Sequence, residues 1–269
     1  MKKITDVNEL RHIQLDMMQY IHVFCIENDI RYSLAFGSML GAVRHHGFIP
    51  WDDDIDIMMP RPDYEKFCKL FNSFNNKDYK AYDYRKDKEY NYPFMKVCDE
   101  RTIRIEKTTV RGLGIYIDVF PIDYFADSYD EALSVVKKVT FWKRIFVSKI
   151  MEPTKKVSLV KNIAIVLAKL FSFFIPMKYV LRRFDKLSCA SSDKTLNYCG
   201  FLVDANKTSI LKAELFNNYS DYPFEQYVFK GIADYDSYLK VQYGDYMTPP
   251  PSNQQTTMHD IVDMYWKEL

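Results

Sequence analysis

Four aspartates lie within five positions of one short segment, PWDDDIDIMM, at residues 50–59: Asp52, Asp53, Asp54 and Asp56. Like charges held this close repel each other unless a cation neutralises them. Carboxylate oxygens with no interleaved Cys or His suit Mg²⁺ or Mn²⁺ better than zinc. We interpret the cluster as a metal site. The alternative is a solvated acidic loop.

The apolar residues around these aspartates predict a strand over residues 54–59. Side chains alternate along a strand, so three of the acids are expected to share one face: Asp52, Asp54 and Asp56. The isoleucines between them would then point toward the core. Asp53 is expected to face away from the site.

A third carboxylate position and a tight turn complete the set of candidates. Asp118 lies in the middle of an apolar strand predicted over 114–120, where burial is costly unless the carboxylate is paired or binds a metal. Gly37 and Ser38 directly follow a short strand predicted over 30–36 and end it. The fold must therefore bring together three features, each beside a predicted strand: a Gly-Ser turn, an Asp-x-Asp and a later acid.

Hydrophobic periodicity predicts the helices and strands that must position these candidate residues. Helical spacing runs from Leu10 to Cys25. Further expected elements are a brief helix over 39–43, a helix opened by Arg61-Pro62-Asp63, a strand pair at 92–99 and 102–105, and helices from 128 to about 188. The segment 243–260, with its three consecutive prolines, is expected to be irregular. Strands interleaved with helices indicate an α+β fold: a mixed sheet core with flanking helices and a mainly helical C-terminal half.

Composition excludes several classes of protein. The chain has 269 residues and a formal net charge of +1, so no global field recruits nucleic acid. Five scattered cysteines without a CxxC pair suit neither a disulfide framework nor a zinc knuckle, which favours reduced thiols. The N-terminal sequence MKKITDVNEL lacks an apolar signal region, which favours a cytoplasmic protein.

The most apolar stretch, residues 162–175, is too short to span a membrane and contains Lys169. We expect an ordinary core helix with snorkelling lysines. The alternative is a helix in the membrane interface, because basic residues flank it on both sides: Lys155, Lys156, Lys161, Lys178, Arg182 and Arg183.

The ordered motifs resemble the nucleotidyltransferase-like superfamily. That resemblance implies that Gly37 and Ser38 hold nucleotide phosphates, and that a divalent metal is held by Asp54, Asp56 and Asp118. It also implies that residues 1–125 form a nucleotidyltransferase-like catalytic core. Residues 126–269 would then be a helical C-terminal region that completes the same catalytic unit.

The longer segment GSMLGAVRHHGFIPWDDDID is similar to the signature of the LicD family, which includes the fukutin-related proteins. FMKVCDERT, IDVFPID and YGDYMTPPP resemble later blocks of that family, so the similarity covers most of the chain except about 129–195. The family implies transfer of a phospho-alcohol, such as phosphocholine or ribitol phosphate, from a CDP-activated donor to a glycan hydroxyl. The zinc-binding cysteine insertion of the mammalian members has no counterpart, so no zinc is expected.

Attack on a diphosphate requires charge neutralisation and in-line positioning more than a covalent nucleophile. Mg²⁺ on the aspartates would bridge the donor phosphates, and a second metal is an option. Arg44 is a candidate phosphate clamp, or else an exposed residue at a helix end. Lys96 is a second candidate, or else a lysine exposed on an edge strand. The general base is expected to be Asp52 or Asp118, ahead of His259.

Aromatic residues make up 16% of the chain, enough to build a cage for a quaternary ammonium group such as choline. Tyr243 and Tyr246 are the first candidates, although a generally Tyr-rich protein would have the same composition. Trp51 is expected to pack beneath the acidic strand. His45 and His46 are expected to be loop residues.

Three functions remain open at this point. The leading hypothesis is metal-dependent transfer of phosphocholine, or a related group, from CDP-choline or a related CDP-alcohol to a cell-surface glycan or its lipid-linked precursor, with release of CMP. A second keeps the metal site but transfers the nucleotidyl group and releases pyrophosphate. A third is a non-catalytic scaffold docked on a membrane, for which the acids would be dispensable.

Overall fold

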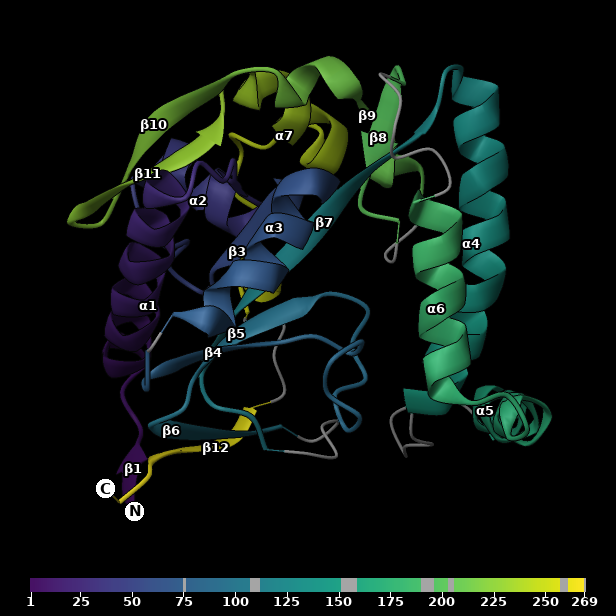
Figure 1. Cartoon of the computed structure of the whole chain (residues 1–269), viewed down its shortest axis with the longest axis horizontal. Coiled ribbons are helices and arrows are strands. Elements are labelled where there is room, and N and C mark those ends of the chain that lie inside the picture. Colours follow the sequence, from purple (N-terminus) through teal and green to yellow (C-terminus); the bar gives the residue numbers. More distant parts are fainter. Residues whose placement is uncertain are drawn as a thin grey trace.

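The computed structural model describes residues 1–74, 76–106, 112–150, 159–189, 196–202, 206–256 and 261–268. It has an α+β fold built around a mixed sheet (Figure 1). The strand order is β2-β3-β7-β5-β4, with β8 on β7 and β9 on β8. The strand bounds are β2 Ser33–Leu34, β3 Asp56–Pro60, β4 Tyr79–Tyr82, β5 Met95–Asp99, β7 Tyr116–Ala126, β8 Tyr198–Gly200 and β9 Leu211–Lys212.

The long strand β7 is the centre of this sheet. It pairs in parallel with β3 and antiparallel with β5, and its far end pairs with β8. Asp118 lies opposite Asp56 on one side and opposite Lys96 on the other. The sheet therefore places two predicted metal ligands and a lysine in adjacent register positions.

A second sheet joins the two ends of the chain, in the order β1-β12-β6. β12 (Ile261–Trp266) pairs with both β1 (Lys2–Ile4) and β6 (Thr102–Glu106). The N- and C-termini consequently lie side by side (Figure 1). The expected pairing of strands 92–99 and 102–105 is wrong, because β5 joins the main sheet and β6 joins this second one.

Helices and a hairpin cover the main sheet. α1 (Val7–Glu27) is capped by Asp6, whose carboxylate accepts a hydrogen bond from the backbone N–H of Asn8 at 2.9 Å. The other helices are α2 Phe36–His45, α3 Arg61–Leu70, α4 Tyr129–Ile150, α5 Leu159–Ser172, α6 Met177–Ser188 and α7 Tyr235–Tyr243. The hairpin is β10 Tyr219–Phe224 and β11 Tyr227–Ile232, and short 3₁₀ turns occur at Phe71–Ser73, Lys207–Ser209, Ala213–Phe216 and Ser252–Gln254.

Several expected elements differ from the observed ones. The helix predicted over 39–43 begins earlier, at Phe36, so Gly37 and Ser38 lie in its first turn, and it includes His45. His45 is therefore not a loop residue, whereas His46 caps the helix in the left-handed region. The strand expected over 30–36 is only Ser33–Leu34, and that over 54–59 begins at Asp56. The hairpin was not predicted, and the irregular segment ends where β12 begins.

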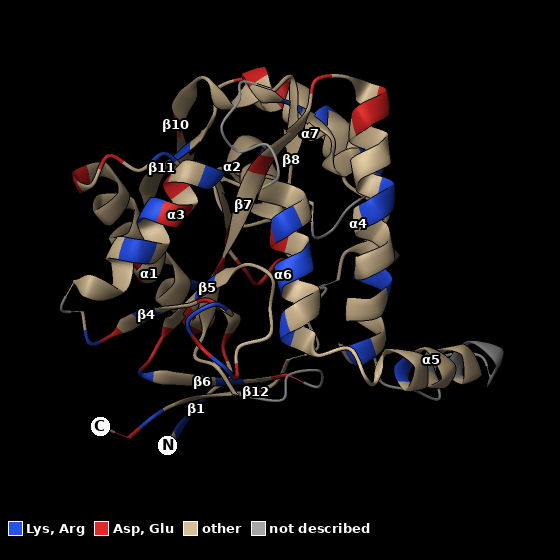
Figure 2. Ribbon diagram, turned by 45° about the vertical axis from the view of Figure 1, so that its right-hand side comes forward, with Lys and Arg blue, Asp and Glu red and all other residues tan. Residues whose placement is uncertain are grey.

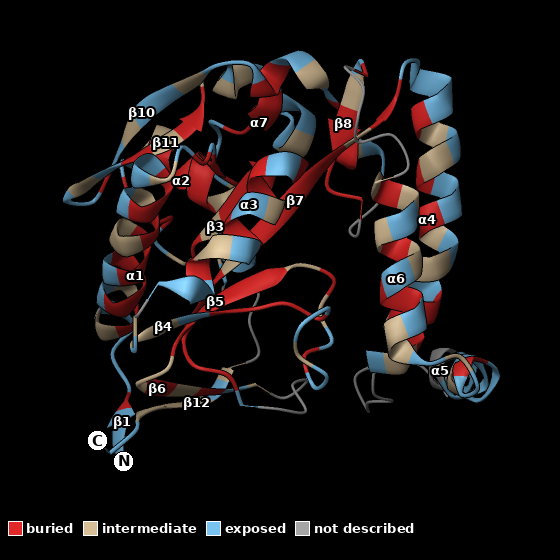
Figure 3. Cartoon of the chain, in the orientation of Figure 1, coloured by how far each residue is buried: buried red, intermediate tan, exposed pale blue. Residues whose placement is uncertain are grey.

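Burial follows the layers of the fold, with the strands largely buried and α5 largely exposed (Figure 3). One large apolar cluster surrounds β3, β7, α1 and the hairpin, and a second lies between α4, α6 and the tyrosines near β5. The prediction that 162–175 is a core helix is wrong where its side chains are described, because Phe171 and Phe174 are exposed. Of the flanking basic residues, Lys155, Lys156 and the side chain of Lys161 lie outside the described residues.

No disulfide joins any of the five cysteines, all of which lie in the described part of the chain, and this agrees with the reduced thiols that the sequence predicts. Within the described part of the chain, every helix is too short or too polar to cross a bilayer.

A buried ion pair locks α3 onto the central strand. The Arg61 guanidinium donates to both carboxylate oxygens of Asp123 on β7, at 2.7 and 2.8 Å, and both side chains are buried. Arg61 directly follows β3, so this pair helps to hold β3 and β7 together at the end opposite Asp56 and Asp118.

We predict that Arg61→Ala lowers the free energy of unfolding by about 3–5 kcal/mol, because it leaves the Asp123 carboxylate buried without a partner. Urea denaturation followed by circular dichroism measures this. Lys240→Ala, which breaks an exposed ion pair with Asp236, is the control and is expected to leave the midpoint nearly unchanged. Equal midpoints for the two variants would contradict the prediction.

Candidate active site

A cavity of about 590 Å³ opens beside the acidic segment. Asp52, Asp54 and Asp56 line it, which agrees with the predicted common orientation of these three acids. The reason differs from the expected one, because Asp52 and Asp54 precede the strand and lie in a loop. The remaining wall consists of Phe36, Gly37, Leu40, Arg44, Ile49, Trp51, Tyr243, Asp245, Tyr246, Thr248, Pro250 and Thr256.

Asp53 lies closer to its neighbours than the predicted outward orientation implies. One carboxylate oxygen from each of Asp52, Asp53 and Asp54 lies within 4.8 Å of the others. Asp53 itself is buried and is not part of the described cavity wall. The loop thus gathers three carboxylates, of which two reach the cavity.

The first turn of α2 faces the same acids. The Ser38 hydroxyl accepts a hydrogen bond from the backbone N–H of Asp56 at 2.8 Å. A Cβ atom on Gly37 would lie only 2.6 Å from a carboxylate oxygen of Asp52, so glycine is needed for this close approach. The first N–H groups of a helix have no partner within the helix, which suits them to an anion.

Phe36, at the start of α2, has a backbone φ of 43°, which is strained for a residue with a side chain. Two contacts hold it there. Its N–H donates to the Tyr238 hydroxyl at 3.0 Å, and its ring packs against Phe120 with ring centroids 5.3 Å apart. Residues distant in the sequence therefore hold the turn that brings Gly37 to the acids.

Electrostatic repulsion dominates the site. Burial and the nearby charge of Asp54 raise the pKa of Asp52 to about 7. Burial, together with Asp54 and Asp118, raises the pKa of Asp56 well above its ordinary value. Burial also raises the pKa of Asp118, although the neighbouring Lys96 opposes the shift. These raised pKa values indicate repulsion among the carboxylates, which a bound cation would relieve.

Lys96 is buried and forms an ion pair with Asp118 at 2.5 Å. Its ammonium also lies 3.5 Å from the centroid of the Tyr116 ring, in cation–π geometry. Neither Lys96 nor Asp118 belongs to the described cavity wall. The alternative of an edge-strand lysine exposed to solvent is wrong, because β5 lies between β4 and β7.

Arg44 lines the cavity from the last turn of α2. Its guanidinium donates to the backbone carbonyl of Tyr246 at 2.6 Å and to the His45 ring at 2.9 Å. These bonds tie α2 to the aromatic segment after α7 and orient the arginine. Tyr243 and Tyr246 both reach the cavity, and Trp51 does so while also packing on the main core, as predicted. His259 lies outside the described residues.

Two residues that hold the acidic loop were not predicted from the sequence. The Arg11 guanidinium, on α1, donates to the backbone carbonyls of Ile49, Pro50 and Asp52 at 3.1, 3.0 and 2.7 Å. Glu225, in the β10–β11 turn, accepts from the N–H of Phe48 at 3.1 Å. Both are polar residues far from the motif, so spacing alone could not connect them to it.

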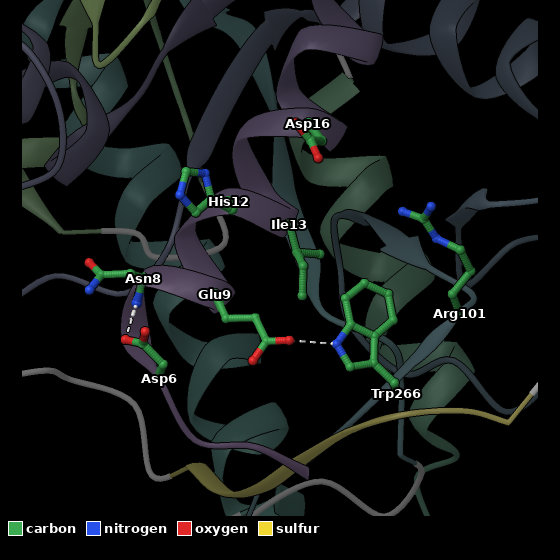
Figure 4. Close-up of a pocket in the computed structure, with 8 residues that line it drawn as sticks. All are labelled: Asp6, Asn8, Glu9, His12, Ile13, Asp16, Arg101 and Trp266. Carbon is green, nitrogen blue, oxygen red and sulfur yellow. Dashed lines mark hydrogen bonds between the residues drawn. The ribbon is translucent and has the colours of Figure 1, made fainter. Parts of the chain in front are cut away.

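A second cavity, of about 420 Å³, lies between α1 and β12 (Figure 4). Its polar groups take part in structural contacts: the Trp266 indole donates to Glu9 at 2.8 Å, and Asp6 caps α1. Arg101 is paired with Asp99. None of the predicted site residues lines this cavity, so it is separate from the candidate site.

Comparisons with known proteins agree with this fold and site. The family model described as LicD/FKTN/FKRP, nucleotidyltransferase domain, matches residues 29–163, which contain the Gly-Ser turn and all the clustered acids. The mixed sheet with its carboxylate cluster is therefore a nucleotidyltransferase-type domain.

The chain is 30% identical over 278 residues to the lipopolysaccharide cholinephosphotransferase LicD of Haemophilus influenzae, across 98% of this chain and 99% of that protein. An uncharacterized protein of Rickettsia typhi is 31% identical over 139 residues, which are 50% of this chain and 41% of that protein. The chain belongs to the LicD family and is a transferase, as the sequence motifs predict.

We predict that Gly37→Ala lowers transferase turnover by about tenfold to a hundredfold, because the added methyl group displaces Asp52. The melting temperature should not fall, since alanine favours a helix. Gly112→Ala is the control, because its Cβ would make only an ordinary 3.4 Å contact with Ile103. Unchanged turnover in Gly37→Ala would show that the close approach is not required.

Proposed function

We propose that this enzyme transfers phosphocholine from a CDP-activated donor to a hydroxyl of a cell-surface glycan or its lipid-linked precursor, and releases CMP. The observation that carries the proposal is the relationship, across nearly the whole length of both chains, to a protein named as a lipopolysaccharide cholinephosphotransferase. The carboxylate cavity offers a site suited to a diphosphate donor. The reaction takes place on the cytoplasmic side, where nucleotide-activated donors are made.

The donor phosphates would lie at the start of α2. Backbone N–H groups of Gly37 and Ser38 provide an anion site at the helix N-terminus, and Arg44 contributes a guanidinium from the opposite end of the helix. The Ser38 hydroxyl already accepts a hydrogen bond from the backbone N–H of Asp56, so the hydroxyl holds the acidic segment in place. The backbone N–H of Ser38 would contact the donor phosphate.

The acids fit a hard divalent cation, because the donor set is entirely carboxylate oxygen and the group is electrostatically strained. Asp54, Asp56 and Asp118 would hold Mg²⁺ or Mn²⁺. Asp54 also belongs to the group of three close carboxylates that it forms with Asp52 and Asp53. The bound ion would neutralise charge on the donor diphosphate. No zinc is required by this donor set.

Asp52 is proposed as the general base. It lines the cavity, where its carboxylate can accept a proton from a hydroxyl of the acceptor. Asp118 is less suited to this role, because it is paired with Lys96.

The choline group would be recognised by the aromatic side of the cavity. Trp51 and Tyr243 line the cavity with aromatic rings, and Asp245 adds a carboxylate to the same wall. A quaternary ammonium binds to such a combination by cation–π and charge attraction. Ribitol and glycerol carry no positive charge, so they would bind more weakly to this side of the cavity.

We predict that CDP-choline with acceptor releases CMP faster than CDP-ethanolamine, CDP-ribitol or CDP-glycerol does. Chromatography of the nucleotide products measures this directly. Trp51→Leu should narrow the advantage of CDP-choline over CDP-ribitol, because it removes the ring but keeps an apolar side chain. Release of pyrophosphate from a nucleoside triphosphate, with no CMP from any CDP-alcohol, would instead identify a nucleotidyltransferase.

We predict that Asp56→Asn abolishes metal-dependent turnover without unfolding the protein. Folding raises the pKa of Asp56, so the metal-free protein loses stability as pH rises through the range where this carboxyl ionises. The asparagine variant avoids that loss and should melt at an equal or higher temperature at neutral pH. Mg²⁺ should raise the melting temperature of the wild type and have little effect on the variant.

Asp16→Asn, at an exposed position on α1, is the matched control and should respond to Mg²⁺ as the wild type does. If Asp56→Asn keeps full activity, the metal assignment is wrong. If all acid variants keep activity, the non-catalytic scaffold becomes the better explanation of the cluster.

A further inference from the structure

Helix α5 exposes a continuous apolar face, because its large exposed apolar residues recur at helical spacing. Phe171, Phe173 and Phe174, at its C-terminal end and just beyond, are 78%, 73% and 87% exposed. The exposed set also includes Ile163, Val166, Leu167 and Leu170. From residue 163 to 174, among the described side chains, Lys169 is the one charged residue.

A helix with an exposed apolar face is stable when other apolar groups cover that face, either in a protein or in a lipid phase. α5 lies away from both core clusters, apart from its end (Figure 1). Its 14 residues are about 21 Å long, shorter than the roughly 30 Å hydrocarbon core of a bilayer. The helix is therefore suited to lie in a membrane interface and not to span it.

The base of α5 is firmly attached to the rest of the protein. The hydroxyls of Ser172 and Ser148, both buried, lie 3.0 Å apart in a hydrogen bond that joins α5 to the end of α4. Ile175 packs against the second core cluster just before α6 begins. The exposed aromatic group thus sits on a fixed support and projects from it.

Positive charge is concentrated in the same region. Residues 132–189 contain thirteen Lys and Arg residues and two acidic ones, in a chain whose formal net charge is +1. Figure 2 shows repeated basic bands along α4 and α6 beside the projecting α5. The exposed members include Lys137, Lys138, Arg144, Arg182 and Lys186. Each Lys or Arg near an anionic surface adds to the attraction between the protein and that surface.

We propose that α5 docks the enzyme on a bilayer that contains anionic lipids, with its apolar residues inserted among the acyl chains and the basic faces of α4 and α6 attracted to the headgroups. This deepens the proposed function, since a lipid-linked acceptor lies at such a surface. The charge of the flanking helices favours an anionic bilayer over a second copy of this chain, whose matching face would be equally basic.

Co-sedimentation with vesicles tests the docking. The full chain should bind mixed phosphatidylglycerol–phosphatidylcholine vesicles, bind pure phosphatidylcholine vesicles more weakly, and lose part of its binding in high salt. Phe171→Ser/Phe173→Ser/Phe174→Ser should weaken binding by at least about tenfold, because inserted aromatic rings are lost. Its melting temperature should be unchanged, since these rings are exposed in the folded protein.

Val23→Ser/Ile26→Ser/Val228→Ser is the matched control, because it removes three exposed apolar side chains from α1 and β11. It should bind vesicles as the wild type does. Equal binding by both triple variants would overturn the proposal. So would a stable dimer in sedimentation velocity that the phenylalanine variant dissociates, since a second copy would then cover α5.

Turnover separates this proposal from the proposed function. With a water-soluble glycan acceptor, the phenylalanine variant should release CMP at the wild-type rate. With an acceptor embedded in vesicles, its rate should fall together with its binding. Vesicle binding without any CMP release would leave the docking surface standing and refute the phosphotransferase assignment, whereas normal CMP release without vesicle binding would do the reverse.

Discussion

Mutual repulsion among partly buried carboxylates is the constraint on which the rest of this structure depends. Asp56 and Asp118 are register neighbours on adjacent parallel strands, and the loop before β3 adds Asp52 and Asp54. Such a group would push its strands apart unless other contacts held them. Lys96 compensates Asp118 from β5, and the Arg61–Asp123 pair binds α3 to the other end of β7.

The loop that carries the remaining acids is held by groups from three distant parts of the chain. Arg11 binds its carbonyls, Glu225 binds the N–H of Phe48, and Tyr238 supports the strained start of α2. These contacts keep the cavity open to a substrate while its negative charge remains concentrated. A site with this much stored repulsion is suited to binding a cation and a polyphosphate together, because the two ligands relieve it.

Charge is distributed unevenly over the molecule, with a basic helical region and an acidic remainder. Residues 132–189, which include α5, α6 and most of α4, hold thirteen basic residues and only two acidic ones, so the rest of the chain, including the site, carries a net negative charge. This separation fits the proposed docking and the proposed donor site, because a basic face would attract an anionic surface while the acidic cavity would hold the proposed metal and donor.

The sequence by itself determined the family, and it also singled out the three cavity acids, Gly37 and Arg44, because these residues belong to one continuous motif that can be read without knowing the fold. Only the tertiary structure decided the partners of Lys96, the roles of Arg11 and Glu225, the separate sheets of β5 and β6, and the exposure of α5. Periodicity identifies apolar segments but not what covers them, so a core helix and a projecting one look alike. Contacts between distant residues depend on how the layers pack, and no local pattern encodes that.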